Sequence, residues 1–219
     1  MLDIFKNIFF FKKEISMANI IFIGPQGSGK GTQAKIISEE LNIPHISTGD
    51  LFRMLEGALR EEVDSYVNKG QLVPDELTVK ILKERITKPD CTNGFILDGF
   101  PRNLNQAKLL DKITKIDKVI EITLTDELAV KRISSRWSCK KCGAVYNSIT
   151  NPPKIKGVCD KCQGELYRRA DDNPDAIKKR LETYHQETEP ILKKYKKVLV
   201  SVDGNQEIDK ISEQILEKL

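Results

Sequence analysis

The stretch Asn19–Thr32, NIIFIGPQGSGKGT, decides the fold of this chain. Its apolar, mostly β-branched beginning, Asn19–Ile23, predicts a buried strand, and the pattern after the last glycine predicts a helix. Glycines between the two let the backbone curl so that its N–H groups point inward at phosphate oxygens, with help from the helix N-terminus. Lys30 adds a mobile cation for the outer phosphates. The stretch therefore predicts a phosphate-binding loop, and the competing interpretation is a glycine-rich turn without a ligand.

The residue after the lysine sets this loop apart. A strict P-loop has Ser or Thr directly after the lysine, whereas here Gly31 intervenes and the hydroxyl comes at Thr32. That variant is typical of nucleoside monophosphate kinases. The residues expected to hold the phosphates are Gly27, Ser28, Gly29, Lys30, Gly31 and Thr32.

Short apolar runs alternate with helical patterns along the rest of the chain. The further predicted strands are His45–Ser47, Gly94–Leu97, Lys118–Leu124 and Val198–Val202. Predicted helices include Thr32–Leu41, Asp75–Ile86 and a C-terminal segment with apolar residues at helical spacing. Such alternation predicts the α/β class: a P-loop NTPase-type parallel sheet flanked by helices.

Composition narrows the class of protein. The 219 residues are 39% hydrophobic and 31% charged, and 36 basic against 32 acidic residues leave a net charge of +4. This balance gives no large field for a nucleic-acid backbone, and no apolar stretch approaches the roughly 20 residues of a membrane-spanning helix. Residues 1–16 are interpreted as a dispensable extension, because their apolar run is short for a secretory signal and no small-residue cleavage site follows. Their Phe cluster also allows weak contact with a membrane surface.

Four cysteines mark a small insertion between about Ser138 and Arg168. Cys139-x-x-Cys142 and Cys159-x-x-Cys162 form two knuckles whose spacing is typical of a structural zinc site with four thiolate ligands. A pair of disulfides is the alternative in an oxidising compartment. A zinc ribbon that binds nucleic acid is a third interpretation.

Several motifs, taken in order, resemble one family. They are GPQGSGKGTQAK, ISTGDLFR, GQLVPDEL, GFILDGFPRN with Gln106, and RRADDNPDAIKKRL. Over residues 17–219 the chain resembles the long-lid, zinc-binding adenylate kinases. The resemblance implies a monomeric, cytoplasmic enzyme of nucleotide biosynthesis that moves a phosphoryl group reversibly from MgATP to AMP, giving two ADP. It implies Mg²⁺ with ATP, a structural Zn²⁺, and no nucleic-acid or membrane partner.

The resemblance also implies a division of the chain into three parts. Residues 17–46, 74–134 and 173–219 are expected to form the core domain, 47–73 a small AMP-binding insertion, and 135–172 a zinc-stapled lid insertion. The sequence departs from the family in its N-terminal extension and in a slightly short segment between Arg53 and Gln71.

Site residues follow from the same resemblance. The ATP set is the phosphate-binding loop with Arg132, Arg136, Asn205 and Gln206. The AMP set is Thr48, Arg53, Leu72, Val73, Gly99, Arg102, Gln106, Arg169 and Arg180. The catalytic set is Lys30, Arg102, Arg132, Arg169 and Arg180, which would offset charge on the transferring phosphoryl group.

Carboxylates and histidines receive separate predictions. Asp98 ends an apolar strand and is expected to hold Mg²⁺ through water, while Asp171 and Asp172 resemble hinge aspartates that pair with arginines when the lid shuts. His45 and His185 are given no chemical role, because neither has a partner at metal or base spacing.

Arg132 and Arg136 are four residues apart, and this spacing predicts that they share one helix face.

Three rival functions stay open at this point. One is a UMP/CMP-type nucleoside monophosphate kinase, and another is a P-loop ATPase with a nucleic-acid-binding zinc ribbon. The third is a metal-stabilised binding module without turnover.

Overall fold

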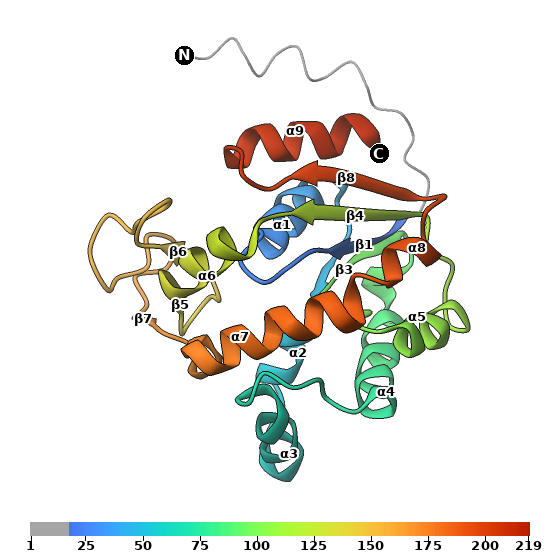
Figure 1. Cartoon of the computed structure of the whole chain (residues 1–219), viewed down its shortest axis with the longest axis horizontal. Coiled ribbons are helices and arrows are strands. Elements are labelled where there is room, and N and C mark those ends of the chain that lie inside the picture. Colours follow the sequence, from blue (N-terminus) through green and yellow to red (C-terminus); the bar gives the residue numbers. More distant parts are fainter. Residues whose placement is uncertain (1–17) are drawn as a thin grey trace.

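The computed structural model describes residues 18–219, and the predicted N-terminal extension lies outside them. Its centre is a five-stranded parallel sheet in the order β2-β3-β1-β4-β8 (Figure 1). All five predicted strands are confirmed to within one residue at each end. Their bounds are β1 Ala18–Ile23, β2 His45–Ser47, β3 Gly94–Asp98, β4 Lys118–Thr123 and β8 Leu199–Asp203.

Helices follow the strands as the alternation predicted. Asp75–Ile86 is a helix with the expected bounds, and the helix expected at Thr32–Leu41 begins two residues earlier, at Lys30. The α-helices are α1 Lys30–Leu41, α2 Thr48–Arg53, α3 Gly57–Val67, α4 Asp75–Ile86, α5 Leu104–Asp111, α6 Asp126–Ser134, α7 Pro174–Thr183, α8 Ile191–Lys194 and α9 Ile208–Lys218. Short 3₁₀ turns are η2 Pro89–Cys91 and η3 Ala170–Asp172, and η4 Tyr184–Thr188 is a π-helix.

The sheet is buried on both faces because its strands alternate between two apolar clusters. In β1, Ile20 and Phe22 join the cluster that includes residues of α1 and α9. Ile21 and Ile23 join the opposite cluster, which includes residues of α4, α5 and η4. Both clusters are closed by helices, as expected for a parallel sheet whose strands are apolar along their length.

The cysteine insertion folds on its own small sheet, which lies beside the central one in Figure 1. Strands β5 Arg136–Cys139, β6 Val145–Asn147 and β7 Leu166–Tyr167 pair antiparallel in the order β6-β5-β7. The sequence predicted no regular element here, because strands of two to four residues are too short for periodicity to register.

The prediction that Arg132 and Arg136 share a helix face is wrong. Helix α6 ends at Ser134, and Arg136 is the first residue of β5. A spacing of four gives a common face only while the helix continues. Arg136 therefore belongs to the small sheet and Arg132 to the helix that leads to it.

The segment around α2 and α3 also has its own apolar cluster, centred on Phe52, Val63 and Val73.

Among residues 18–219, every helix is too short or too polar to cross a membrane.

Candidate active site

The phosphate-binding loop lies between β1 and α1, at the carboxyl end of the central strand. Gly24 and Gly27 both have positive φ, 151° and 83°. A Cβ on Gly24 would lie 2.3 Å from the Ile122 carbonyl oxygen, and one on Gly27 would lie 2.8 Å from the Ala129 carbonyl oxygen. The loop therefore needs glycine at both positions, because a side chain would collide with β4 or α6.

Lys30 opens α1 and folds its side chain back over the loop. Its Nζ donates to the carbonyl oxygens of Gly24 (2.7 Å) and Pro25 (2.8 Å). Burial lowers the pKa of Lys30 to about 8, although Asp98 opposes this shift. Nearby, Gln26 Oε1 and Ser28 Oγ are buried without a hydrogen-bond partner among the described residues. The loop thus presents a cation and free polar atoms to a ligand.

The remaining loop residues form the first turn of α1 and the step before it. Gly29 has φ of 95° and precedes the helix, while Gly31 and Thr32 are exposed in its first turn. A Cβ on Gly31 would lie 3.1 Å from Asp98 Oδ2. Glycine after the lysine therefore leaves room for this carboxylate beside the loop.

Asp98 ends β3, next to the loop. Burial alone would raise its pKa, but the His45 imidazole and the charge of Lys30 outweigh burial, and the pKa of Asp98 is lowered. His45 Nε2 lies 3.5 Å from Asp98 Oδ2, which is too long for a well-formed hydrogen bond but close enough for electrostatic attraction. Sequence spacing missed this pair, because β2 and β3 become neighbours only through sheet order.

The expected AMP residues gather at the ends of β2 and β3. Thr48 Oγ1 donates to the Gly99 carbonyl oxygen (2.9 Å), and Arg102 Nε donates to the same oxygen (2.7 Å). Arg53 NH2 contacts Asp50 Oδ1 at 2.5 Å. Burial lowers the pKa of Arg102, with Asp98 opposing and Arg53 adding repulsion.

Of the residues expected to line the base pocket, Leu72 and Val73 point in different directions. Leu72 lines a hollow together with Arg102 and Arg180, whereas the Val73 side chain packs into the α2–α3 cluster. Gln106 is 2% exposed, and its amide contacts Asp75 and the Arg102 backbone.

Arginines from distant segments lie within electrostatic reach of one another in part. Burial lowers the pKa of Arg169 to about 10, and repulsion from Arg136 and Arg53 adds to the effect. Burial also lowers the pKa of Arg180 to about 10, and Arg136 and Arg102 repel it. Both groups therefore stay positive at neutral pH, and both lie within electrostatic reach of Arg136.

Two aspartates neutralise part of this charge. Arg136 makes a two-pronged contact with Asp172, with Nε to Oδ2 at 2.9 Å, and Arg180 NH1 donates to Asp171 Oδ2 at 2.9 Å. Arg169 Nε donates to Ser138 Oγ at 2.9 Å. Asp171 and Asp172 thus pair with arginines, as the resemblance implied.

Arg132 and the segment after β8, both expected to bind ATP, pack against the phosphate-binding loop. Arg132 NH1 is 3.5 Å from the Gly27 carbonyl oxygen. A Cβ on Gly204 would lie 3.0 Å from the Ser28 carbonyl oxygen, so the turn after β8 packs against the loop. Asn205 in that turn donates its backbone N–H to Asp203, and Gln206 accepts from Gln214 of α9.

A second hollow includes residues that the sequence analysis did not single out. Arg132 and Asn205 line it together with Leu128, Lys131, Asn147, Ile149 and Thr150. Asn147 Nδ2 donates to the Arg132 carbonyl oxygen at 2.9 Å, which ties β6 to the end of α6. No sequence pattern marked Asn147, because a strand of three residues, such as β6, is too short to show periodicity.

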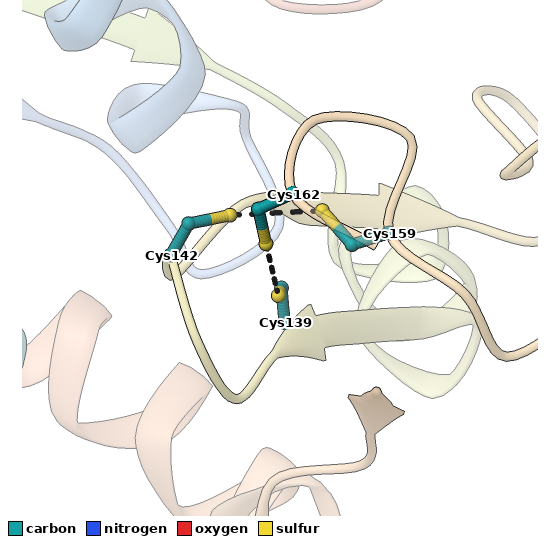
Figure 2. Close-up of side chains that lie close together, drawn as sticks. All are labelled: Cys139, Cys142, Cys159 and Cys162. Carbon is teal, nitrogen blue, oxygen red and sulfur yellow. Dashed lines mark hydrogen bonds between the residues drawn. The ribbon is translucent and has the colours of Figure 1, made fainter. Parts of the chain in front are cut away.

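Four cysteine sulfurs meet in the small sheet, where Figure 2 shows them converging from two loops. All four lie within 4.8 Å of one another, with Cys139 to Cys162 at 3.5 Å and Cys142 to Cys159 at 3.6 Å. A disulfide needs about 2.05 Å, whereas thiolates 2.3 Å from one tetrahedral zinc lie about 3.8 Å apart. The cluster therefore fits a four-coordinate metal and excludes formed disulfides among these four.

Tyr146 supports the cysteine cluster from β6. Its hydroxyl accepts the Asp160 backbone N–H at 2.8 Å and lies 3.4 Å from Cys159 Sγ. Since the hydroxyl has a single proton, that proton is free to point at the sulfur. The Tyr146 hydrogen bond is the main cause that lowers the pKa of Cys159 to about 6.

The P-loop, the buried carboxylate and the ring of guanidinium groups together define a P-loop phosphotransferase. A family model for adenylate kinase matches residues 22–200. The adenylate kinase of Archaeoglobus fulgidus is 49% identical over 214 residues, covering 92% of this chain and 99% of the relative. That of Clostridioides difficile is 49% identical over 210 residues (91% and 97%), and that of Methanocella arvoryzae 48% over 205 residues (89% and 95%).

This chain belongs to the adenylate kinase family. It catalyses reversible phosphoryl transfer between ATP and AMP, with Mg²⁺ accompanying ATP. The family match disfavours the UMP/CMP kinase, nucleic-acid ATPase and inactive-module interpretations.

Proposed function

We propose that the convergent arginines and Lys30 promote this transfer by positioning and charge neutralisation, without a covalent intermediate on the enzyme. An AMP phosphate oxygen attacks the γ-phosphorus of ATP, and the bond to the β–γ bridging oxygen breaks, so ADP leaves with the electron pair. Negative charge spreads over the equatorial oxygens of the transferred group in a loose transition state. The observation that supports the proposal is that Lys30 lies within electrostatic reach of Arg102, Arg136 and Arg180, and that Arg102 and Arg136 in turn repel Arg180.

Acceptor and donor residues take different parts in this proposal. Arg53 and Arg102 hold the AMP phosphate, and Arg169 and Arg180 bridge toward the γ-phosphoryl. Thr48, Leu72 and Gln106 lie around the AMP base, and Val73 contributes its backbone there while its side chain packs into the α2–α3 cluster. Gly27–Thr32 cradle the ATP phosphates, Arg132 and Arg136 hold the ATP side, and Asn205 and Gln206 lie beneath its base. Asp98 would hold Mg²⁺ through water, and the bound metal would offset charge on the ATP phosphates. Gly99 lets Arg102 approach, because its Cβ would lie 3.1 Å from Arg102 NH2.

Specificity for AMP is tested by mixing MgATP with AMP, UMP, CMP or GMP and following ADP. We expect AMP to exceed each of the others by at least about 100-fold in kcat/KM, since hydrogen-bonding sites reject bases that leave polar groups unpaired. Comparable rates with UMP or CMP would contradict the assigned base pocket.

Lys30→Met tests the charge assignment. It should lower kcat by about 100-fold or more, as losses of transition-state charge contacts do. Lys35→Met, an exposed change on the same helix, is the matched control and should leave kcat unchanged. Equal turnover of the two variants would reject the mechanism.

The zinc site is also part of the proposal. Cys139, Cys142, Cys159 and Cys162 would bind one structural Zn²⁺ as thiolates, since four protein ligands leave no open position for chemistry. The metal would staple residues 135–172 into a lid that excludes water, which could otherwise accept the phosphoryl group. Metal analysis of the reduced, folded protein should find one zinc per chain.

The division into core (17–46, 74–134, 173–219), AMP-binding segment (47–73) and lid (135–172) belongs to this proposal, as do a monomeric state and a cytoplasmic location. The separate cluster of the small sheet supports the division, and the cluster of the α2–α3 segment meets the core through Leu77 and Ile81 of α4. Light scattering should give the monomer mass.

Filter binding should show no salt-sensitive binding to single-stranded RNA, and flotation with anionic vesicles should leave the protein unbound.

A further inference from the structure

Asp75, the first residue of α4, accepts hydrogen bonds from three side-chain amides of the neighbouring segment. Asn103 Nδ2 (2.9 Å) and Gln106 Nε2 (2.8 Å) donate to its Oδ1, and Asn105 Nδ2 (2.7 Å) donates to its Oδ2. Burial raises the pKa of Asp75, but the three amides outweigh burial and the pKa lies below its ordinary value. Asp75 is therefore an ionised carboxylate at neutral pH and acts only as an acceptor.

The Gln106 amide is held at both ends by partners of opposite kind. Its Oε1 accepts the backbone N–H of Arg102 at 2.7 Å, while its Nε2 faces Asp75. A reversed amide would set N–H against N–H at Arg102 and oxygen against a carboxylate at Asp75. Both contacts would leave buried polar groups unpaired, which is costly. The orientation of the amide is thus fixed.

Each end of the Gln106 amide keeps one hydrogen-bonding capacity after these contacts. An amide nitrogen has two N–H groups and its oxygen two lone pairs, so one donor and one acceptor remain in a fixed order. Adenine carries an amino donor at C6, next to a ring-nitrogen acceptor. A 6-oxopurine carries an oxygen acceptor at C6, next to a ring N–H donor. The two bases therefore need amides of opposite orientation.

We propose that Asp75 is a specificity-determining positioning residue, which fixes the Gln106 amide in the orientation that accepts adenine and rejects 6-oxopurines. The inference rests on the proposed contact between Gln106 and the AMP base. Asp75 acts through Gln106 and does not itself touch the substrate.

The test compares kcat/KM for AMP and for inosine monophosphate in Asp75→Ala. Without the carboxylate, only the Arg102 N–H still holds the amide, so reversal costs less than in the wild type. AMP should therefore lose about 10-fold while inosine monophosphate loses little or gains. The ratio of inosine to adenosine monophosphate should rise by about 10-fold or more. A purely structural role would lower both values together, and an unchanged ratio would overturn the proposal.

Two further variants, at Asp75 and at its partner Asn105, serve as controls for this test. Asn105→Ala removes a donor to the far oxygen of Asp75 without touching Gln106, so the ratio should stay at the wild-type value. Asp75→Asn keeps the side-chain shape and can offer Gln106 either a donor or an acceptor, so the ratio should rise, though less than in Asp75→Ala. If Asp75→Ala fails to fold in urea titration, the Asp75→Asn ratio decides: a wild-type value overturns the proposal.

Gln106→Leu separates failure of this inference from failure of the proposed base contact. It should raise KM for AMP and bring the two monophosphates close to equal kcat/KM. An unchanged KM for AMP would show that Gln106 does not meet the base, and both statements would fall. If Gln106→Leu raises KM for AMP but the Asp75 variants leave the ratio of kcat/KM values unchanged, the role of Asp75 is contradicted while the base contact of Gln106 stands.

Discussion

Lys30 is partly buried and donates from its ammonium group to two carbonyl oxygens of its own loop. Its pKa is lowered from 10.5 to about 8, mainly by burial. Between those pH values the unfolded chain holds a proton that the folded chain has released. The free energy of unfolding therefore gains a contribution from Lys30 as pH rises from 8 to 10.5, and below pH 8 the burial penalty is complete.

Urea unfolding of the ligand-free protein at several pH values checks this expectation. The unfolding free energy of wild type relative to Lys30→Met should rise by at most about 3 kcal/mol between pH 7 and pH 10.5. The same comparison with Lys35→Met should show no such trend, because Lys35 is exposed. A flat difference for Lys30→Met would mean that Lys30 is not desolvated in solution.

Tyr146 gives a second prediction at the scale of one residue. Removing its hydroxyl in Tyr146→Phe takes a hydrogen bond from Cys159, and outer partners of metal ligands typically contribute 10- to 100-fold in affinity. We expect zinc affinity, measured by competition with a chromophoric chelator, to fall by about 10-fold. Tyr167→Phe, on β7 of the same small sheet, is the control and should leave the affinity unchanged.

Single residues were predictable where the sequence places them in a continuous motif. Lys30 contacts its own loop, and the four cysteines form two Cys-x-x-Cys pairs, so motif spacing was enough. The contacts of His45 with Asp98 and of Gln106 with Asp75 join segments that only the sheet order and helix packing bring together. Those contacts needed the structure.

At the scale of elements, the link between the small sheet and the core depends on η3. Asp172 is 3% exposed and pairs with Arg136 of β5, while Asp171 pairs with Arg180 of α7. Asp172→Asn would leave the Arg136 guanidinium largely buried without its counter-charge. Breaking a buried pair by removing one partner costs about 3 to 5 kcal/mol.

We therefore expect Asp172→Asn to lower the free energy of unfolding by about 3 kcal/mol and to raise KM for ATP. Asp175→Asn removes the same charge from an exposed position in α7, so it should change stability by less than about 0.5 kcal/mol. Similar effects of the two variants in urea unfolding would show that the ion pair contributes nothing special.

Elements of the core were predictable because their strands are apolar along their length and their helices carry clear periodicity. The small sheet was not, since its order comes from sulfur convergence and backbone pairing rather than from an apolar pattern. The break between α6 and β5 was also missed. Ser134 and Ser135 interrupt the helix there, and serine is a weaker helix former than the residues before it.

For the whole molecule, the proposed zinc site predicts the order in which the parts of the protein unfold. The small sheet has few buried side chains of its own, centred on Cys139, Tyr146, Cys159 and Leu166. Zinc removal should therefore unfold residues 135–172 first and lower the thermal midpoint by several degrees. Limited proteolysis should cut this segment in the metal-free protein while the core fragments stay intact.

Matched cysteine variants make the metal prediction specific. Cys159→Ser should reproduce the proteolytic pattern of the metal-free protein, whereas Cys91→Ser, which changes a buried thiol outside the small sheet, should not. Protection of residues 135–172 in the metal-free protein would contradict the role of zinc as a staple.

The place of β8 at the edge of the sheet has a consequence for synthesis on the ribosome. Strand β4 pairs with β1 and β8, but β8 is made only after residues 124–198 have been added. At about 5 to 20 residues per second, that interval lasts roughly 4 to 15 s. Throughout it, one side of β4 is open to strands from neighbouring nascent chains. Codon choice that slows translation between these strands should therefore lower the yield of soluble protein without altering a single amino acid.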